Sequence, residues 1–345
     1  MLYTNSETVW RGVPVIDCSE EQCAIRPVPT GPLLWEAADL TEAHYVVRLP
    51  EEAINEIDRV AAFIESCPVQ LYQRSESEVN WPVVRQHMQV LKSRVNDGPG
   101  FAVLQGFDPD RYSDEVNVEI FWLLGQCMGK NVAQKWNGEM IYGVRDTGQA
   151  HHFGIRASRT AVELVFHVDN AFGIAVPDYV GLLCMRPAKS GGISRFCSLY
   201  ALHERIKKAD PDALQRLYEP MLFNRQQEHR EGAPLVTLAP FFSWRNDRLF
   251  SRANASLVRS GYELSEIEID PALEKALRSI ESICEDEGLW FEAPLERGHV
   301  QYLNNHEVGH YRSAFEDYEE PALKRHLYRI WNREQGPINY DAMAS

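Results

Sequence analysis

The 345-residue sequence predicts an α+β fold whose core is a distorted double-stranded β-helix, that is, a cupin-like jelly roll. Short strand-like runs separated by Gly and Pro follow one another from about residue 140. Amphipathic segments then occupy much of about 199–290, and strand-like runs return after 298. Late strands that return beside early ones, around a helical insertion and with flanking helices, are typical of a jelly roll.

The length fits one large domain, because β-barrel and sandwich domains reach about 250 residues or more with helical additions. We expect a single domain over 1–345, with no internal repeat. It divides into an N-terminal elaboration (1–99), the jelly-roll core (100–333) with the helical insertion at about 199–290, and a tail (334–345).

The first third of the chain alternates loops, helices and one strand. Residues 1–45 are rich in Pro and polar residues, which predicts strand fragments and loops. Apolar residues at helical spacing predict helices over 50–66, 82–95 and 114–129, and Pro50 followed by two glutamates suits a helix start. The apolar, glycine-bounded run at 100–107 predicts a strand.

The later elements follow from the same two periodicities. Helical spacing predicts helices over 199–209, 212–222 and 271–286. Short apolar runs bounded by Gly and Pro predict strands over 163–169, 178–187, 193–199, 298–305 and 325–333.

The composition limits the function classes. With 44% hydrophobic and 25% charged residues it is ordinary for a globular protein, and a net charge of −15 argues against a nucleic-acid partner. No apolar run approaches the roughly 20 residues that span a bilayer, and the N-terminus lacks the pattern of a signal peptide. The seven scattered cysteines form no CxxC pair, so we expect reduced thiols and a cytoplasmic protein without a membrane partner.

The run FHVDNAF (166–172) places His167 and Asp169 two residues apart in a predicted strand. Side chains at i and i+2 point to the same face of a strand, so an imidazole and a carboxylate would share that face. A second histidine would complete a 2-His-1-carboxylate site for Fe(II). A core histidine paired with the aspartate is the competing interpretation. The same spacing at His229 and Glu231 lies in a polar loop and is interpreted as solvated surface.

The motif HEVGH (306–310) indicates a different enzyme class. It matches HExxH, in which His306 and His310 would bind zinc and Glu307 would act as general base. That motif requires a helix, whereas the preceding residues alternate like a strand and Gly309 disfavours a helix interior. A zinc peptidase therefore stays an alternative to a site in which His310 alone is a ligand. Glu307 would then lie at the surface or behind the site.

Three segments together resemble a known family. HVDNAF, PAKSGGISRFCS and NNHEVGHYRSAFEDYEEPALKRHLYRIW are similar to the taurine dioxygenase / clavaminate synthase-like family of Fe(II)/2-oxoglutarate-dependent oxygenases. The shared pattern is HxD, a glycine pair followed by Ser or Thr, a later H-x-R-x-x-F, and two arginines four residues apart. The resemblance covers about residues 100–333.

The resemblance implies an iron site formed by His167, Asp169 and His310. It further implies that Arg325 pairs with the distal carboxylate of 2-oxoglutarate, helped by Ser194, which stands where Thr is common. A guanidinium with a hydroxyl donor is what a carboxylate needs in a partly dry pocket.

Other residues are candidates for binding substrate or 2-oxoglutarate. Arg329 would share the inward face of Arg325 and either hold an acidic substrate or assist 2-oxoglutarate. Glu163 and Asn170 flank the HxD pair and are substrate candidates. Loop residues that could overhang the site, or lie at the surface, are His151, His152, Trp136 and Asn137.

We therefore expect a dioxygenase that uses Fe(II), 2-oxoglutarate and O₂. It would hydroxylate an unactivated C–H bond of an acidic or amino-acid-like small molecule, with release of succinate and CO₂. Desaturation, cyclisation and epoxidation stay open as outcomes, and so does a homo-oligomer. The alternative from another class is a jelly-roll protein that binds a ligand without catalysis.

Overall fold

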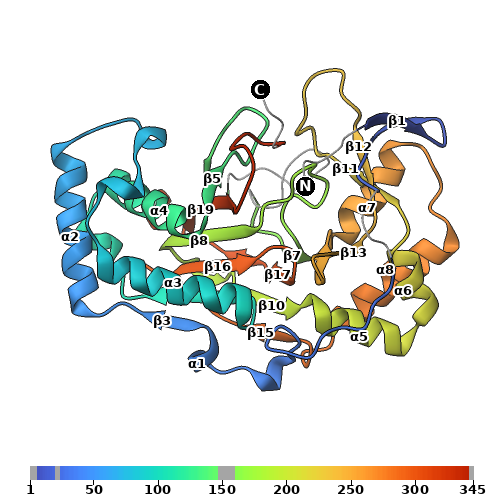
Figure 1. The fold of residues 1–345 in the computed structure, drawn as a ribbon, viewed down its shortest axis with the longest axis horizontal. Helices are drawn as coiled ribbons and strands as arrows, with labels where there is room; N and C mark the ends of the chain where they lie inside the picture. Colours follow the sequence, from blue (N-terminus) through green and yellow to red (C-terminus); the bar gives the residue numbers. More distant parts are fainter. Residues whose placement is uncertain (1–5, 20–23, 147–159, 342–345) are drawn as a thin grey trace.

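The computed structural model describes residues 6–19, 24–146 and 160–341 and has a mixed α and β architecture (Figure 1). Its largest sheet has the order β3-β4-β16-β8-β19-β5, and β6 also pairs with β19. These strands are β3 (Val46–Arg48), β4 (Phe101–Gln105), β5 (Lys130–Val132), β6 (Ile141–Val144), β8 (Tyr179–Arg186), β16 (Val300–Asn304) and β19 (His326–Arg333). The predicted strands at 100–107, 178–187, 298–305 and 325–333 are thereby confirmed.

A second sheet has the order β15-β10-β17-β7. Its strands are β7 (Leu164–His167), β10 (Ser194–Ser198), β15 (Trp290–Glu292) and β17 (Val308–Arg312). The turn at 305–307 carries the chain from β16 in the large sheet to β17 in this one. Residues of both sheets line one cavity of about 710 Å³, which therefore lies between them.

Helices cover the large sheet at one end of the molecule (Figure 1). They are α2 (Glu51–Ser66), α3 (Pro82–Asp97) and α4 (Asp114–Met128), as the apolar spacing predicted. α3 contacts β4 and β16, and α4 contacts β19 and β5. Their buried faces form one core with the sheet, which gives the strands of the site a rigid backing.

The insertion at about 199–290 is not purely helical, which corrects the prediction. It contains α5 (Leu199–Ala209), α6 (Pro211–Leu217), α7 (Ala255–Leu264) and α8 (Pro271–Cys284), but also β11 (Met221–Asn224), β12 (Val236–Ala239), β13 (Phe242–Arg245) and β14 (Arg248–Ser251). The helix expected over 212–222 ends at Leu217 because Pro220 and the buried strand β11 follow. β11 and β12 are buried along their whole length, so they lack the alternation that reveals a strand.

The N-terminal strands pack on the insertion rather than on the core sheets. β1 (Ser6–Trp10) and β2 (Val13–Asp17) form a sheet of order β1-β2-β12-β11. The short remaining elements are α1 (Glu42–Tyr45), the β9 (Ser190–Gly191) and β18 (Phe315–Glu316) pair, and the 3₁₀ turns η1 (Ala37–Asp39), η2 (Leu71–Gln73), η3 (Glu76–Glu78), η4 (Pro109–Arg111) and η6 (Pro321–Leu323).

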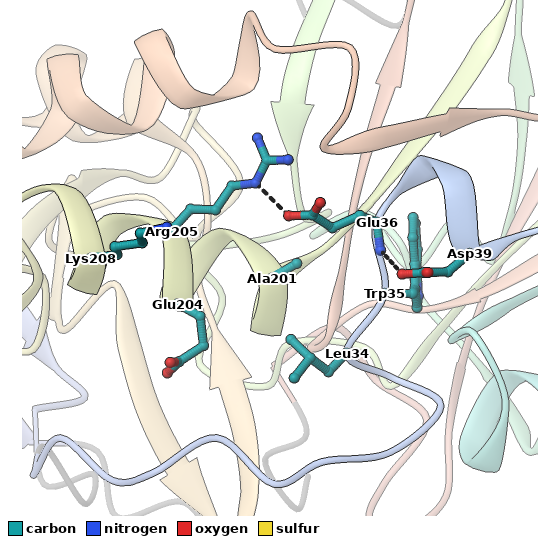
Figure 2. A pocket seen from close by; sticks show the side chains of 8 residues that line it. All are labelled: Leu34, Trp35, Glu36, Asp39, Ala201, Glu204, Arg205 and Lys208. Carbon is teal, nitrogen blue, oxygen red and sulfur yellow. Dashed lines mark hydrogen bonds and ion pairs between the residues drawn. The ribbon is translucent and has the colours of Figure 1, made fainter.

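A second cavity, of about 590 Å³, lies where the N-terminal segment crosses α5 (Figure 2). Arg205 donates to Glu36 across it at 2.8 Å, and Asp39 accepts from the Glu36 backbone N–H at 2.8 Å. Trp35 in its wall is buried and donates to the Pro99 carbonyl at 2.8 Å. These contacts fasten the segment to the body of the protein, so we interpret this cavity as a structural junction.

No helix among the described residues is long and apolar enough to cross a membrane. Cysteines in the same part of the chain are free thiols, as expected, namely Cys18, Cys67, Cys127, Cys184, Cys197 and Cys284.

Candidate active site

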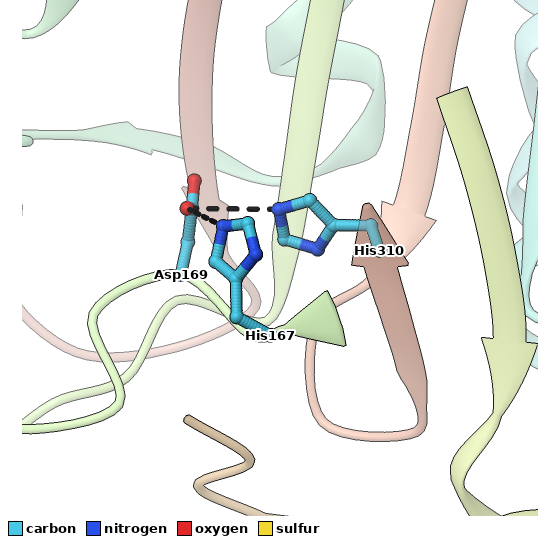
Figure 3. Close-up of side chains that lie close together, drawn as sticks. All are labelled: His167, Asp169 and His310. Carbon is cyan, nitrogen blue, oxygen red and sulfur yellow. Dashed lines mark ion pairs between the residues drawn. The ribbon is translucent and has the colours of Figure 1, made fainter. Parts of the chain in front are cut away.

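Two histidines and one aspartate meet at the small sheet (Figure 3). His310, in the middle of β17, is the antiparallel Cα partner of His167 at the end of β7, and Asp169 follows two residues later. The Nε2 atom of each histidine lies 3.7 Å from Asp169 Oδ1. All three ligand atoms lie within 4.8 Å of one another. Strand pairing thus brings together the three residues that the resemblance implied as iron ligands.

Each imidazole turns its Nε2 toward Asp169, so both can act as metal ligands through that atom. His167 Nδ1 lies 2.8 Å from the Val165 carbonyl, which can only accept, so Nδ1 carries a hydrogen and Nε2 is the nitrogen left to bind a metal. Burial, together with the charge of neighbouring His167, lowers the pKa of His310 to about 4. At neutral pH His310 is therefore neutral, which is the form that binds a metal.

The Asp169 carboxylate is held in one orientation. Its Oδ2 atom accepts hydrogen bonds from Trp331 Nε1 at 2.8 Å and from Arg329 Nη1 at 3.0 Å. Burial alone would raise the pKa of Asp169, but Arg329 and the two histidines hold it well below its usual value. The group is therefore a carboxylate with Oδ1 left to bind a metal.

The loop that carries Asp169 is anchored through its backbone. Asn305 accepts from the Asp169 N–H at 2.8 Å and donates to the Asp169 carbonyl at 2.9 Å. The fully buried Arg252 donates to the carbonyls of Ala171 and Gly173 at 2.7 and 2.8 Å. These contacts fix the position of the carboxylate relative to β7.

The donor set fits a first-row divalent metal. Two imidazole nitrogens and one carboxylate oxygen on one side are the facial triad of non-haem Fe(II) oxygenases, which leaves positions open for other ligands. All three residues line the cavity between the sheets, so those positions would face its interior. Such an ion would be held by His167, Asp169 and His310.

The cavity also contains a buried cation. Arg325 is 6% exposed, and its Nη1 has no hydrogen-bond partner among the described residues. Burial lowers its pKa to about 10, so it stays charged at neutral pH. Ser194, on β10, lines the same cavity. A buried unpaired guanidinium is costly, and a carboxylate ligand would remove that cost.

The glycine pair that precedes Ser194, Gly191 and Gly192, leaves room for the Arg325 side chain. Gly191 and Gly192 have φ values of +73° and +67°, a region that favours glycine. A Cβ at Gly192 would lie 3.2 Å from Arg325 Nε, and one at Gly191 would lie 2.2 Å from the Ala314 carbonyl oxygen. The pair therefore has a steric role in the site.

Arg312 is a cavity residue that sequence reasoning did not assign. It lies two residues after His310 on β17 and opposite Ser194 on β10, and it is 6% exposed. The signal that could have found it is its spacing from His310, because residues i and i+2 of a strand share a face. Burial and the nearby charge of Arg325 lower its pKa to about 9.

Arg329 lies in the cavity wall with Leu327 and Trp331, as an inward-facing strand predicts. Besides Asp169 it contacts Gln134, whose Oε1 accepts from Arg329 Nε at 2.8 Å. Its Nη2 has no hydrogen bond within the described ranges. Arg329 therefore orients a triad member and still has a donor for another group.

The two predicted neighbours of the triad have different surroundings. Glu163 lines the cavity and accepts a hydrogen bond from Tyr311. Asn170 also lines it, but has a φ of +55° and accepts from the Tyr340 hydroxyl at 2.8 Å. That contact uses the predicted tail, where Tyr340 is buried.

The HEVGH segment is a turn followed by a strand, so the helix that a zinc peptidase requires is absent from it. His306 Nε2 contacts Asp178 at 2.8 Å. Glu307 is 1% exposed, accepts from Arg248 Nε at 2.7 Å and from the Tyr200 hydroxyl at 2.7 Å. The expectation that Glu307 could be a surface residue is wrong, because its carboxylate is buried and pairs with the partly exposed Arg248.

Of the other candidate residues in the described structure, His229 lines the cavity and the rest lie outside its wall. His229 is half-buried and lines the outer cavity, whereas Glu231 is exposed. Trp136 is 42% exposed, and its backbone N–H donates to Glu228 at 2.8 Å. Asn137 accepts from a nearby backbone N–H in its own loop, and His151 and His152 lie outside the described residues.

Comparisons of structure support the same fold. Asparagine oxygenase, solved with Fe(II), 2S,3S-3-hydroxyasparagine and succinate, superposes with a TM-score of 0.64 at 16% identity, over 84% of this chain and 94% of that chain. The non-heme iron oxygenase OrfP, in complex with Fe and alpha-ketoglutaric acid, gives a TM-score of 0.58 at 13% identity over the same shares.

Sequence comparisons extend over most of the chain. FR-33289 synthase of Streptomyces rubellomurinus is 26% identical over 325 residues, 90% of this chain and 92% of that protein. Taurine hydroxylase-like protein SAT17 of Stachybotrys chartarum is 23% identical over 316 residues, 86% of this chain and 78% of that protein.

The family described as "Taurine catabolism dioxygenase TauD, TfdA family" matches residues 70–331, well over half of the chain. Together with the triad, this match identifies a non-haem Fe(II)/2-oxoglutarate-dependent dioxygenase that uses iron, 2-oxoglutarate and O₂. The chain belongs to the TauD/TfdA family of dioxygenases.

Proposed function

We propose that this dioxygenase hydroxylates an unactivated C–H bond of an acidic or amino-acid-like small molecule and releases succinate and CO₂. The observation that carries the proposal is the convergence, in one cavity, of the His167–Asp169–His310 triad and the unpaired cation of Arg325. When bound, iron with 2-oxoglutarate and O₂ supplies the oxidising chemistry.

The protein's part is to bind and orient. His167, Asp169 and His310 hold the metal, while Trp331 and Arg329 keep Asp169 charged and oriented. Arg325 and Ser194 bind the distal carboxylate of 2-oxoglutarate, because a guanidinium and a hydroxyl together donate to its oxygens. The cavity walls shield the reacting groups from bulk water.

The substrate class follows from the donors that stay free. Arg329 lines the cavity, and its Nη2 has no hydrogen bond in the described structure, so a substrate carboxylate could accept from it. Glu163 offers a negative charge farther along the wall, which suits the ammonium group of an amino-acid-like molecule. The similar asparagine oxygenase and OrfP structures contain hydroxylated amino acids, which agrees with this class.

The architecture is compatible with the proposal. Two sheets that enclose the triad fit a double-stranded β-helix, and we infer one oxygenase domain on that basis. A cytoplasmic location, hydroxylation rather than desaturation, and a homo-oligomer stay predictions.

The test is succinate release from 2-oxoglutarate by the Fe(II)-loaded protein, in a screen of acidic and amino-acid substrates. His167→Ala and His310→Ala should each abolish turnover. Full turnover in both variants would rule out the triad.

A second pair of variants separates this proposal from the peptidase alternative. Asp169→Ala should abolish Fe(II) binding, whereas Glu307→Ala should lower stability but retain Fe(II) binding, because Glu307 faces Arg248 rather than the cavity. Peptidase activity that needs Glu307 and tolerates Asp169→Ala would contradict the assignment.

A further inference from the structure

Two buried guanidinium groups, not one, face the same part of the cavity. Arg312 and Arg325 both line it, and both stack on the ring of Phe315, with distances of 4.8 and 5.1 Å from the guanidinium carbon to the ring centroid. They reach this ring from different segments, since Arg312 belongs to β17 and Arg325 lies in the loop that immediately precedes β19. Both charges therefore lie near one ring, and the Arg325 charge is close enough to lower the pKa of Arg312.

Neither guanidinium forms an ion pair in the part of the protein that the structure describes, and the charges of Asp146 and Asp317 act on Arg312 and Arg325 only at longer range. Arg312 Nη2 donates to the Thr160 and Val162 carbonyls, but its Nε and Nη1 are buried without a partner. Arg325 Nη1 is likewise unpartnered, and neither residue forms an ion pair with a described carboxylate. Asp317 accepts from the Arg325 backbone N–H at 2.7 Å, and its carboxylate forms no ion pair with the Arg325 guanidinium.

Such an arrangement is unfavourable unless an anion binds to it. Removing one guanidinium from water without a partner costs several kcal/mol, and a second like charge nearby adds repulsion. One carboxylate has two oxygens with about four acceptor sites, so it can accept from two guanidinium groups at once. Ser194, the Cα partner of Arg312, lies at the same place.

We propose that Arg312 is a second cation for the distal carboxylate of 2-oxoglutarate, so that Arg312 and Arg325 bind this group jointly. The inference rests on the proposed co-substrate role of Arg325 and extends it. Its consequence is specificity: the site selects a 2-oxo acid that ends in a carboxylate, and disfavours one of similar length that ends in a methyl group.

The test is anaerobic calorimetry on the Fe(II)-loaded protein with 2-oxoglutarate and with 2-oxopentanoate, which lacks the distal carboxylate. Arg312→Gln should weaken 2-oxoglutarate binding by about 10- to 100-fold, the range for a hydrogen bond between charged groups. Binding of 2-oxopentanoate and of Fe(II) should not change. A purely structural role for Arg312 would weaken both 2-oxo acids equally.

Matched variants make the result decisive. Arg195→Gln changes the same residue type on β10, where Arg195 contacts Glu292 and lies outside the cavity wall, and it should bind 2-oxoglutarate normally. Arg312→Lys keeps the charge but loses the two-donor fork, so it should show a smaller loss, again confined to 2-oxoglutarate. This variant answers the question if Arg312→Gln does not fold.

The outcomes separate the two proposals. Unchanged 2-oxoglutarate affinity in folded Arg312→Gln, or an equal loss for both 2-oxo acids, would overturn the role of Arg312 alone. Failure of the unaltered protein to bind 2-oxoglutarate, or undiminished binding in Arg325→Gln, would overturn the proposed function of the site.

Discussion

Replacing Trp331 with Phe tests how the protein prepares Asp169 for the metal. The substitution keeps an aromatic ring but removes the indole N–H that donates to Asp169 Oδ2 at 2.8 Å. In the variant only Arg329 still holds this oxygen, at 3.0 Å. The carboxylate can then rotate, so that Oδ1 is no longer fixed toward the two histidines.

The expected magnitude follows from the number of contacts that are lost. Residues that support metal ligands typically contribute about 10- to 100-fold to metal affinity. Because one of the two donors to Oδ2 stays, we expect the Fe(II) affinity to fall by an amount near the lower end of this range, about tenfold or roughly 1.4 kcal/mol. The smaller ring also leaves space beside Arg329, which should lower stability by about 1–3 kcal/mol.

Anaerobic calorimetric titration of the metal-free protein with Fe(II) measures the affinity, and thermal unfolding measures the stability separately. Trp244→Phe is the matched control, since Trp244 is equally buried and its indole N–H donates to the Tyr218 hydroxyl at 2.8 Å, away from the cavity. It should lose stability but keep its Fe(II) affinity. Unchanged Fe(II) affinity in folded Trp331→Phe would refute the reasoning.

Three further predictions follow from the same geometry. Glu307→Gln should lower the free energy of unfolding by roughly 1–3 kcal/mol, because it weakens the contact of this buried side chain with Arg248. The variant should keep its Fe(II) affinity, and a loss of metal binding would contradict this prediction. Gly192→Ala should lower the free energy of unfolding by about 1–2 kcal/mol, because alanine tolerates the positive φ of this position poorly. The added methyl group should also crowd Arg325 and raise the KM for 2-oxoglutarate, and an unchanged KM would argue against that contact. The metal-free protein should lose up to roughly 3 kcal/mol of stability as the pH falls from 6.5 toward 4. The reason is that His310 has a pKa near 6.5 in the unfolded chain but about 4 in the folded protein. His310→Gln should flatten that part of the profile of Tm against pH, and an identical slope would speak against the low pKa.

Much of the fold could be predicted because it depends on local periodicity. The helices α2, α3 and α8 each have a continuous apolar stripe, which is visible in one stretch of sequence, whereas α4 is buried over most of its circumference. The strands β11 and β12 could not be predicted, because they are short and buried on both faces. Their assignment depends on contacts with β2 and α7, which are far away in the sequence.

In the candidate site, too, some features depend on local spacing and others on contacts between distant segments. The spacing of His167 and Asp169, and that of Arg325 and Arg329, predicted shared strand faces. Both pairs do line one cavity, but Asp169 lies in the turn after β7 and Arg325 lies before β19, so strand alternation alone does not place them there. The role of Glu307 could not be predicted, because its partner Arg248 lies on β14 and approaches only in the folded protein.

The sequence by itself determined which residue types are available and how they are spaced: the HxD pair, the glycine pair, and the two arginines before and on the last strand. The tertiary structure decided which histidine meets that pair, since antiparallel pairing of β7 and β17 places His310 opposite His167 and leaves His306 beside Asp178. It also decided that Arg329 contacts Asp169 and that Arg312 and Arg325 pack against the same ring of Phe315. The physical reason is that strand register and burial arise between segments distant in the chain, whereas side-chain alternation arises within each one.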